Sequence, residues 1–153
     1  MKLTLPDKSI RELEEGSSGF DLAKDIGPGL AKAAVAININ GEQKDLLDPI
    51  SEDADVSIIT INSEEGLEIM RHTLTAQVLA RAIKNIYPDS ELAIGPTIKD
   101  CFYYDFKTKE TVSIDDLDNI EKEMTKIIDS KSKITKKLFS KKDALKVFTG
   151  NKD

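Results

Sequence analysis

The chain has few of the residues that build metal centres and cross-links. Cys101 is its one cysteine and His72 its one histidine, and it has no tryptophan. A single cysteine cannot close an internal disulfide, and a single histidine excludes any site made from two histidines of this chain. Structural zinc within this chain is therefore not expected, and we predict no metal site and no cofactor for this segment.

Long hydrophobic runs are also missing. No apolar stretch approaches the roughly 20 residues that span a bilayer, and the first residues lack a long apolar core behind their charges. A membrane partner is therefore not expected, and the cytoplasm is the default location. The hydrophobic fraction of 39% suits a soluble globular protein of one domain or two small ones.

The excess of negative charge argues against a protein that coats nucleic acids non-specifically, and no DNA partner is expected. The net charge is −6, but the range 126–146 holds eight lysines against two aspartates, so it carries +6 and the remainder −12. Two interpretations of this basic range stay open. It is a solvated face, which is the commoner case, or it meets phosphates, for which Lys133, Lys136 and Lys137 are the candidates.

The first sixty residues alternate strand and helix signals. Strands are expected near 1–5 and 9–13, followed by a helix over 20–26. A strand over 35–39 is expected to pair with a second strand that continues through Leu46-Leu47, and a final strand covers 56–61. Asn40-Gly41 is the strongest hairpin signal in the sequence. Two strands, a helix and then two or three strands are typical of a ubiquitin-like β-grasp, so the predicted fold class is α+β.

One amphipathic helix is predicted next, from about Glu64 to Tyr87. Ser63 is its expected N-cap, and Pro88 cannot continue it. Its apolar stripe recurs every three or four residues, at Leu67, Met70, Leu74, Val78 and Ala82. The start of this helix separates a predicted domain over residues 1–62 from a second over 63–153.

An aromatic strand is expected after a backbone break at Ile94-Gly95-Pro96. In the range 102–106 the alternation places Phe102, Tyr104 and Phe106 on one face and the two residues between them on the other. Ser113 and Asp116 form a capping box for a helix that is predicted to cover this strand. A strand over 134–139 and a short helix over 141–148 are predicted to close the chain.

Four ordered blocks resemble the N-terminal region of threonyl-tRNA synthetase. The blocks are Arg71-His72-Thr73, Leu92-Ala93-Ile94-Gly95-Pro96, Phe102-Tyr103-Tyr104-Asp105-Phe106, and Asp116-Leu117 with Ile120-Glu121-Lys122-Glu123-Met124. The first sixty residues are similar to the TGS domain of that family, through Asp21-Leu22-Ala23, residues 30–36 and Asn40-Gly41. The resemblance implies a TGS domain followed by the first part of an α+β editing domain, cut from a longer protein.

The resemblance also implies a function. In that family the editing domain hydrolyses serine wrongly attached to threonine tRNA, so tRNA(Thr) is the implied partner, through the parent enzyme. The ATP and zinc of that enzyme belong to an aminoacylation domain absent from this segment, and its usual homodimer forms through absent domains too. The segment is therefore not expected to charge tRNA by itself.

The editing helix of the family carries His-x-x-x-His, and this chain lacks the second histidine. If the two sequences are aligned from the start of the helix, His72 matches the first histidine of the pattern and Ala76 the second. If they are aligned from Gln77 onward, Thr73 matches the first histidine and Gln77 the second. The segment from His72 to Pro96 is one residue longer than usual. On an ideal α-helix His72 and Gln77 would diverge by about 140°, but a π-bulge would realign them.

His72 and Gln77 are accordingly the candidate editing residues. His72 can act as a base near neutral pH, whereas Gln77 only exchanges hydrogen bonds, so hydrolysis should be weakened. An equal alternative for His72 is a helix-start residue tied to nearby backbone. Cys101 stands where the family has glycine, and a buried structural thiol is favoured there over a residue that narrows the pocket.

Two other functions stay open. One is a free-standing, non-catalytic module that binds tRNA or another partner and has a decayed editing site. The other is a free-standing deacylase related to the alanyl-tRNA editing proteins, and the single histidine counts against it.

Overall fold

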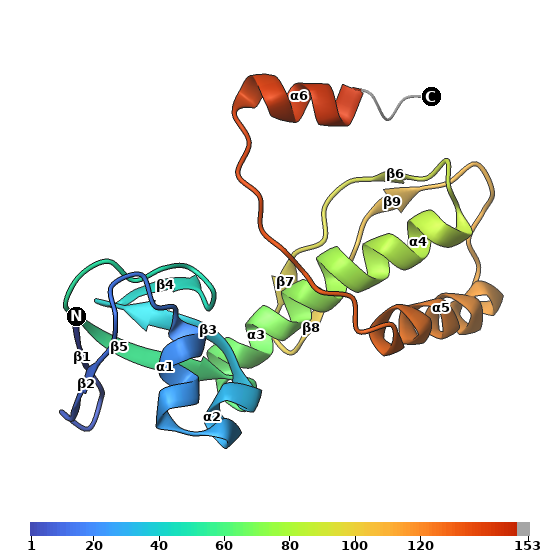
Figure 1. The fold of residues 1–153 in the computed structure, drawn as a ribbon. Coiled ribbons are helices and arrows are strands. Elements are labelled where there is room, and N and C mark those ends of the chain that lie inside the picture. The colour runs from blue at the N-terminus through green and yellow to red at the C-terminus, as the bar shows by residue number, and fades with distance from the viewer. Residues whose placement is uncertain (150–153) are drawn as a thin grey trace.

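The fold has a sheet-based part and a helix-based part, joined by a short connection (Figure 1). The computed structural model describes residues 1–149. The last strand of the sheet ends at Thr60 and the long helix begins at Glu64, so the predicted boundary between residues 62 and 63 falls in the connection. Independent folding of two domains stays a prediction, and residues 150–153 of the second lie outside the described residues.

Seven elements make up the sheet-based part. They are β1 (Lys2–Thr4), β2 (Ile10–Glu12), α1 (Gly19–Ile26), α2 (Pro28–Ala33), β3 (Ala34–Ile39), β4 (Glu42–Asp45) and β5 (Ala54–Thr60). The sheet has the order β2-β1-β5-β3-β4, in which β1 and β5 are parallel and the other neighbours antiparallel. This arrangement confirms the predicted ubiquitin-like β-grasp.

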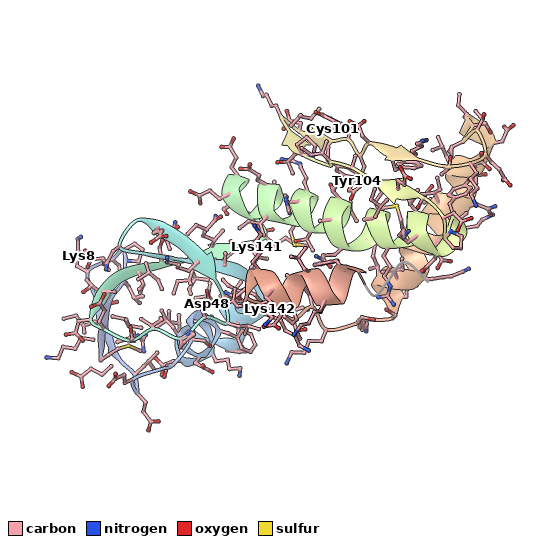
Figure 2. The ribbon with its side chains drawn as sticks, turned by 90° about the horizontal axis from the view of Figure 1, so that it is seen from above. Lys8, Asp48, Cys101, Tyr104, Lys141 and Lys142 are labelled. Atoms are coloured by element: carbon pink, nitrogen blue, oxygen red, sulfur yellow. The ribbon has the colours of Figure 1, made fainter. Side chains whose placement is uncertain are left out.

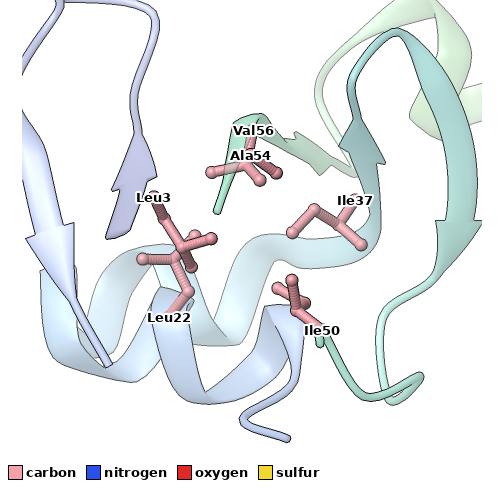
Figure 3. Close-up of a cluster of buried hydrophobic side chains, with 6 residues drawn as sticks. All are labelled: Leu3, Leu22, Ile37, Ile50, Ala54 and Val56. Atoms are coloured by element: carbon pink, nitrogen blue, oxygen red, sulfur yellow. The ribbon is translucent and has the colours of Figure 1, made fainter. Parts of the chain in front are cut away.

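The core of this part lies between the sheet and α1 (Figure 3). Its buried side chains are Leu3, Leu22, Ile37, Ile50, Ala54 and Val56. Each fully buried leucine or isoleucine stabilises the fold by about 1.5–3 kcal/mol. The helix can approach closely because Gly19 has no side chain: a Cβ there would stand 3.0 Å from Ile37.

A capping box fixes the start of α1. The Ser18 hydroxyl accepts a hydrogen bond from the Asp21 N–H (3.3 Å), and the Asp21 carboxylate accepts from the Ser18 N–H (3.0 Å) and hydroxyl (2.6 Å). The hydroxyl bond is the largest of the causes that hold the pKa of Asp21 below its usual value. Backbone donors that the first helical turn leaves unpaired are satisfied in this way.

The sheet differs from the sequence prediction at the end of β4. Leu46 and Leu47 form a turn instead of continuing the strand. The Asp45 carboxylate accepts the Leu47 N–H (2.8 Å), and the Asp45 carbonyl accepts the Asp48 N–H (3.1 Å). The short aspartate side chain offers the backbone a local partner in place of the strand ladder, so the strand ends there.

A continuous long helix supports the second part. It consists of α3 (Glu64–Thr73), a π-helical segment η1 (Leu74–Leu79) and α4 (Ala80–Ile86), so the predicted helix is confirmed to within one residue. The Ser63 hydroxyl caps it by accepting the Gly66 N–H at 3.0 Å. A Cβ on Gly66 would stand 1.9 Å from the Thr60 carbonyl oxygen. The first turn therefore lies directly against the end of β5.

An irregular antiparallel ribbon lies beside the long helix. Its strands are β6 (Glu91–Leu92), β7 (Thr97–Ile98), β8 (Cys101–Phe102) and β9 (Phe106–Lys107). β6 pairs with β9 and β7 with β8, and between the pairs the Asp105 N–H donates to the Ile94 carbonyl (2.8 Å). The predicted strand over 102–106 is thus split in two. Its alternation is confirmed, because Phe102, Tyr104 and Phe106 are half-buried whereas the residues between them are exposed.

The capping box at Ser113 and Asp116 is confirmed. It opens a 3-10 turn, η2 (Ile114–Asp116), which continues into α5 (Leu117–Asp129). The prediction that this helix covers the aromatic strand is wrong: α5 packs on α4 and η1. Ile120 is buried in that contact, and the Asn85 amide of α4 donates to the Glu123 carboxylate at 2.9 Å. In Figure 1 the β6–β9 pair lies on the other side of α4.

From the end of α5 to residue 149, the chain forms no strand. Residues 131–140 are exposed throughout and lie outside helices and strands, so the strand predicted over 134–139 is wrong. An extended segment needs a hydrogen-bonded neighbour to become a strand, and within residues 1–149 none pairs with it. The predicted closing helix is confirmed as α6 (Lys141–Thr149), which stands apart in Figure 1. Among the described helices, none combines the length and apolar character that crossing a bilayer requires.

Replacing Asp21 by asparagine should destabilise the sheet-based part at neutral pH, because the capping box loses its charged acceptor. Since folding lowers the pKa of Asp21, its contribution is present above the ordinary Asp range and is lost as the pH falls through the folded-state pKa. The stability difference between wild type and Asp21→Asn should therefore shrink as the pH is lowered from about 6 to about 2.

Urea unfolding at a series of pH values measures this difference. Glu52→Gln is the control, because Glu52 is exposed and makes no hydrogen bond within the described residues. A difference for Asp21→Asn that is the same at every pH would contradict the role given to the carboxylate.

Candidate functional site

The long helix widens into a π-helix two residues beyond His72. The Ala80 N–H donates to the Thr75 carbonyl, five residues back, where an α-helix would use the residue four back. The π-bulge that the extra residue suggested is confirmed. One additional residue is absorbed here without breaking the helix.

The π-helical segment changes the angle between His72 and Gln77 around the helix axis. Both side chains are exposed, whereas Thr75 and Ala80 are buried. Where hydrogen bonds run to the fifth residue back, each residue turns the helix by less than 100°. His72 and Gln77 therefore diverge by less than they would on an unbroken α-helix.

The inner side of the bulge is packed by Thr75, Gly95 and Tyr104. Thr75 is fully buried, and its hydroxyl donates to the Arg71 carbonyl at 2.8 Å. A Cβ on Gly95 would stand 2.6 Å from Thr75 Cγ2 and 2.1 Å from Tyr104 Cδ2, so only glycine fits. Figure 2 shows Tyr104 on the side of the long helix where the ribbon lies. The break at Gly95 therefore lets the ribbon approach η1.

A groove of about 390 Å³ opens beside Gln77. Its helix side is formed by Ala76, Gln77, Val78 and Arg81. Its other side is formed by residues 127–128 of α5 and by residues 131–135. His72 lies outside these lining residues, in the last turn of α3, and within residues 1–149 its side chain makes no hydrogen bond. The alternative that ties His72 to nearby backbone at a helix start is therefore wrong.

The groove combines apolar side chains with positive charge. Val78, Ile127, Ile128 and Ile134 supply apolar surface, and the charged groups are Arg81, Lys131 and Lys133. None of these three cations forms an ion pair within the described part of the chain, and no acidic side chain lines the groove. Such a lining suits a ligand that has an anionic group beside an apolar one.

The three predicted phosphate contacts are not equivalent. Lys133 lines the groove with Gln77. Lys136 instead pairs with Asp48 of the sheet-based part, and the hydrogen bond that its ammonium donates to the Asp48 carboxylate raises the pKa of Lys136. Lys137 is exposed and has no ion pair among the described residues. The structure therefore brings one of the three to the candidate site.

Cys101 is exposed, so the favoured interpretation of a buried structural thiol is wrong. Its Sγ donates to the Phe102 carbonyl at 3.3 Å, and Figure 2 shows it on the ribbon side of the helix. Within residues 1–149 no three His, Cys, Asp or Glu side chains gather closely enough to hold a metal ion.

Two basic residues of the groove, Arg81 and Lys131, are missing from the sequence prediction. A signal for Arg81 exists, because it follows Gln77 by four residues and so lies on the same helical face. Lys131 reaches the groove only through the packing of α5 on α4, which no local pattern reveals. Chemically, the face offers one imidazole as a base, one amide for hydrogen bonds and several cations for an anionic ligand.

The first part of the chain matches a known family. The TGS domain family matches residues 1–60, which span the five-stranded sheet and its two helices.

Nearly the whole chain is similar to curated threonine–tRNA ligases. It is 45% identical to the threonine–tRNA ligase of Hyphomonas neptunium over 148 residues, which are 97% of this chain and 22% of that protein. It is 46% identical to the enzyme of Paramagnetospirillum magneticum over 147 residues, 95% of this chain and 23% of that protein. For threonine–tRNA ligase 1 of Bacillus subtilis the identity is 45% over 144 residues, 94% of this chain and 22% of that protein. The chain thus spans less than a quarter of the length of these relatives.

Gly95→Ala should destabilise the helix-based part and loosen the π-turn, because the new methyl group would overlap Tyr104 and Thr75. Overpacking of this kind costs about 1–3 kcal/mol. Amide hydrogen exchange at Leu79 and Ala80 should become faster, and urea unfolding should show the loss of stability.

Gly29→Ala is the matched control, since no atom lies within 4 Å of a Cβ at that position in α2. It should be neutral or slightly stabilising, because alanine favours a helix over glycine by about 1 kcal/mol. Unchanged exchange at Leu79 and Ala80 in Gly95→Ala would show that the ribbon does not hold the bulge.

Proposed function

We propose that the chain is the N-terminal part of a threonine–tRNA ligase, a TGS domain followed by the start of an editing domain, and that it serves tRNA binding and proofreading in that enzyme. The proposed substrate is Ser-tRNA(Thr), whose ester the editing domain hydrolyses. Charging of tRNA, with its ATP and zinc, is assigned to the aminoacylation domain of the longer enzyme, and so is the homodimer interface. The proposed location is the cytoplasm.

The need for hydrolytic proofreading has a physical reason. Serine differs from threonine by one methyl group, and a binding pocket gains only about 1–3 kcal/mol of discrimination from such a difference. A second site that accepts the smaller product and hydrolyses it raises the fidelity further.

The observation that carries the proposal is the π-turn just beyond His72. The proposed register, which this turn supports, has Gln77, and not Ala76, as the partner of His72. Gln77 then corresponds to the second histidine of the family pattern. His72 is the proposed base that orders a water molecule near the ester, and Gln77 is proposed to hold the tRNA terminus by hydrogen bonds.

The charges around this face support tRNA binding. Lys133, Lys131 and Arg81 lie in the groove beside Gln77, without acidic neighbours among its lining residues. Lys137 adds a further exposed cation nearby in the chain. Contacts of this kind bind phosphate groups whatever the nucleotide sequence, and they weaken as salt is added.

Exposed apolar side chains support packing against further polypeptide in the enzyme. Leu138 is 91% exposed and Phe148 72%, and the other large ones after α5 include Ile134, Phe139 and Val147. A soluble domain rarely leaves a cluster of this kind in water. We propose that the rest of the editing domain covers it.

The second candidate function is a non-catalytic tRNA-binding or partner-binding module with a decayed editing site. Two observations favour it: Gln77 cannot exchange a proton near neutral pH, and no hydrogen bond within residues 1–149 orients the His72 ring. A hydrolysis assay separates the two functions.

Gln77→His should raise the rate of Ser-tRNA(Thr) deacylation by roughly a hundredfold, the low end of what one general base contributes. Ala76→His is the matched control and should leave the rate unchanged, because position 76 is in register with His72 only on an unbroken α-helix. His72→Ala should abolish hydrolysis in both backgrounds.

Release of labelled serine measures the rate. Equal gains for Gln77→His and Ala76→His would contradict the register given by the π-turn. Absence of hydrolysis in wild type and Gln77→His alike, with tRNA binding intact, would favour the non-catalytic module.

The double substitution Lys133→Gln, Lys137→Gln should weaken tRNA binding about equally for all tRNA sequences. Each phosphate contact that is lost should lower the slope of log affinity against log salt concentration by about 0.7–0.9. Fluorescence anisotropy at several salt concentrations measures the slope. Lys32→Gln, an exposed lysine of α2, is the control, and an equal effect of that substitution would contradict a role specific to the residues after α5.

A further inference from the structure

The segment between α5 and α6, residues 131–140, is called the strap here. All of its residues are exposed, and it begins with Lys131, whose backbone has the left-handed φ of 49°. Figure 1 shows the strap crossing the long helix before it reaches α6. Residues 131–135 line the groove beside Gln77, and the next residue, Lys136, contacts Asp48. Among the described residues this is the strap's one ion pair with the sheet-based part.

Asp48 is held on a well-fixed loop. Its N–H donates to the Asp45 carbonyl (3.1 Å), and the neighbouring Leu46 carbonyl accepts the Phe20 N–H (3.0 Å). Two residues further on, the Ile50 N–H donates to the Ser17 carbonyl (2.9 Å), and the Ile50 side chain is in the core. The Asp48 carboxylate is therefore presented to Lys136 by a rigid scaffold.

The strap has no comparable support. Its charged side chains are lysines, and the Lys136 side chain is itself 47% exposed where it meets Asp48. An exposed pair of this kind changes an equilibrium by no more than about fivefold. A polyanion that releases counterions on binding can therefore displace it.

We infer that Asp48 masks Lys136 as a stand-in for a phosphate, and that an RNA phosphate competes with Asp48 for this lysine. The inference rests on the proposed function and adds a regulatory contact to the same site. While Lys136 is held by Asp48, the strap is tied toward the TGS domain. When a phosphate takes Lys136, the strap is released, and Lys136 joins Lys133 and Lys137 as an RNA contact.

Asp48→Asn tests the mask in the full chain, with fluorescein-labelled tRNA(Thr) as the probe. The substitution should tighten binding by about two- to fivefold, because it removes the competing acceptor. Glu52→Gln makes the same change in net charge on the same part of the molecule, at an exposed residue that has no ion pair within residues 1–149. It should change the affinity by less than about 1.5-fold at physiological salt.

Lys136→Gln completes a double-mutant cycle. In that background Asp48→Asn should bring no gain, because the lysine that it would free is gone. An equal gain with and without Lys136, or equal effects of Asp48→Asn and Glu52→Gln, would overturn the mask while leaving tRNA binding in place.

Limited trypsin digestion without RNA gives a second measurement. Cleavage after Lys136, relative to cleavage after Lys133, should rise by about two- to fivefold in Asp48→Asn. An unchanged ratio would also overturn the mask. No salt-dependent tRNA binding by wild type or by Asp48→Asn would overturn the proposed function, and the competition with it.

Discussion

The helix-based part depends on the π-helical register of η1, which ends with the hydrogen bond from the Ala80 N–H to the Thr75 carbonyl. This register inserts one residue between His72 and the apolar face of α4. On an unbroken α-helix, the residues before and after this segment could not keep both their exposed and their buried positions aligned along the helix. Thr75, Gly95 and Tyr104 pack so closely at this turn that the ribbon and the bulge require each other. The candidate site and its structural support therefore share one cause.

Much of the fold could be predicted from short-range signals. The capping residues Ser63 and Ser113 and the turn at Asn40-Gly41 all stand where the sequence predicts them. These signals act over three or four residues, so tertiary contacts seldom override them. The errors occur where a local pattern allowed two outcomes. Leu46 could extend a strand or enter a turn, and the carboxylate of Asp45 decided for the turn.

The site was predictable only in part, because its two sides have different origins. His72 and Gln77 lie on one helix, and counting residues was enough to suggest the bulge between them. The opposite side comes from the chain after α5, whose place depends on α5 packing on α4 and not on the ribbon. Sequence periodicity shows that a helix has an apolar face but does not say which neighbour covers it. The exposure of Cys101 could not be predicted for a similar reason, because it depends on whether any element covers the edge of the ribbon.

The uneven charge of the chain links the two parts. A net charge of −6 would repel RNA if it were spread evenly, but the range 126–146 alone carries +6. A basic segment in an acidic molecule forms ion pairs with carboxylates of its own chain where the backbone brings them close, and Lys136–Asp48 is such an ion pair. Because both groups remain partly in water, screening keeps the pair weak. An anionic ligand therefore has to outcompete only a modest internal attraction, and the same contact can hold the strap when no ligand is bound.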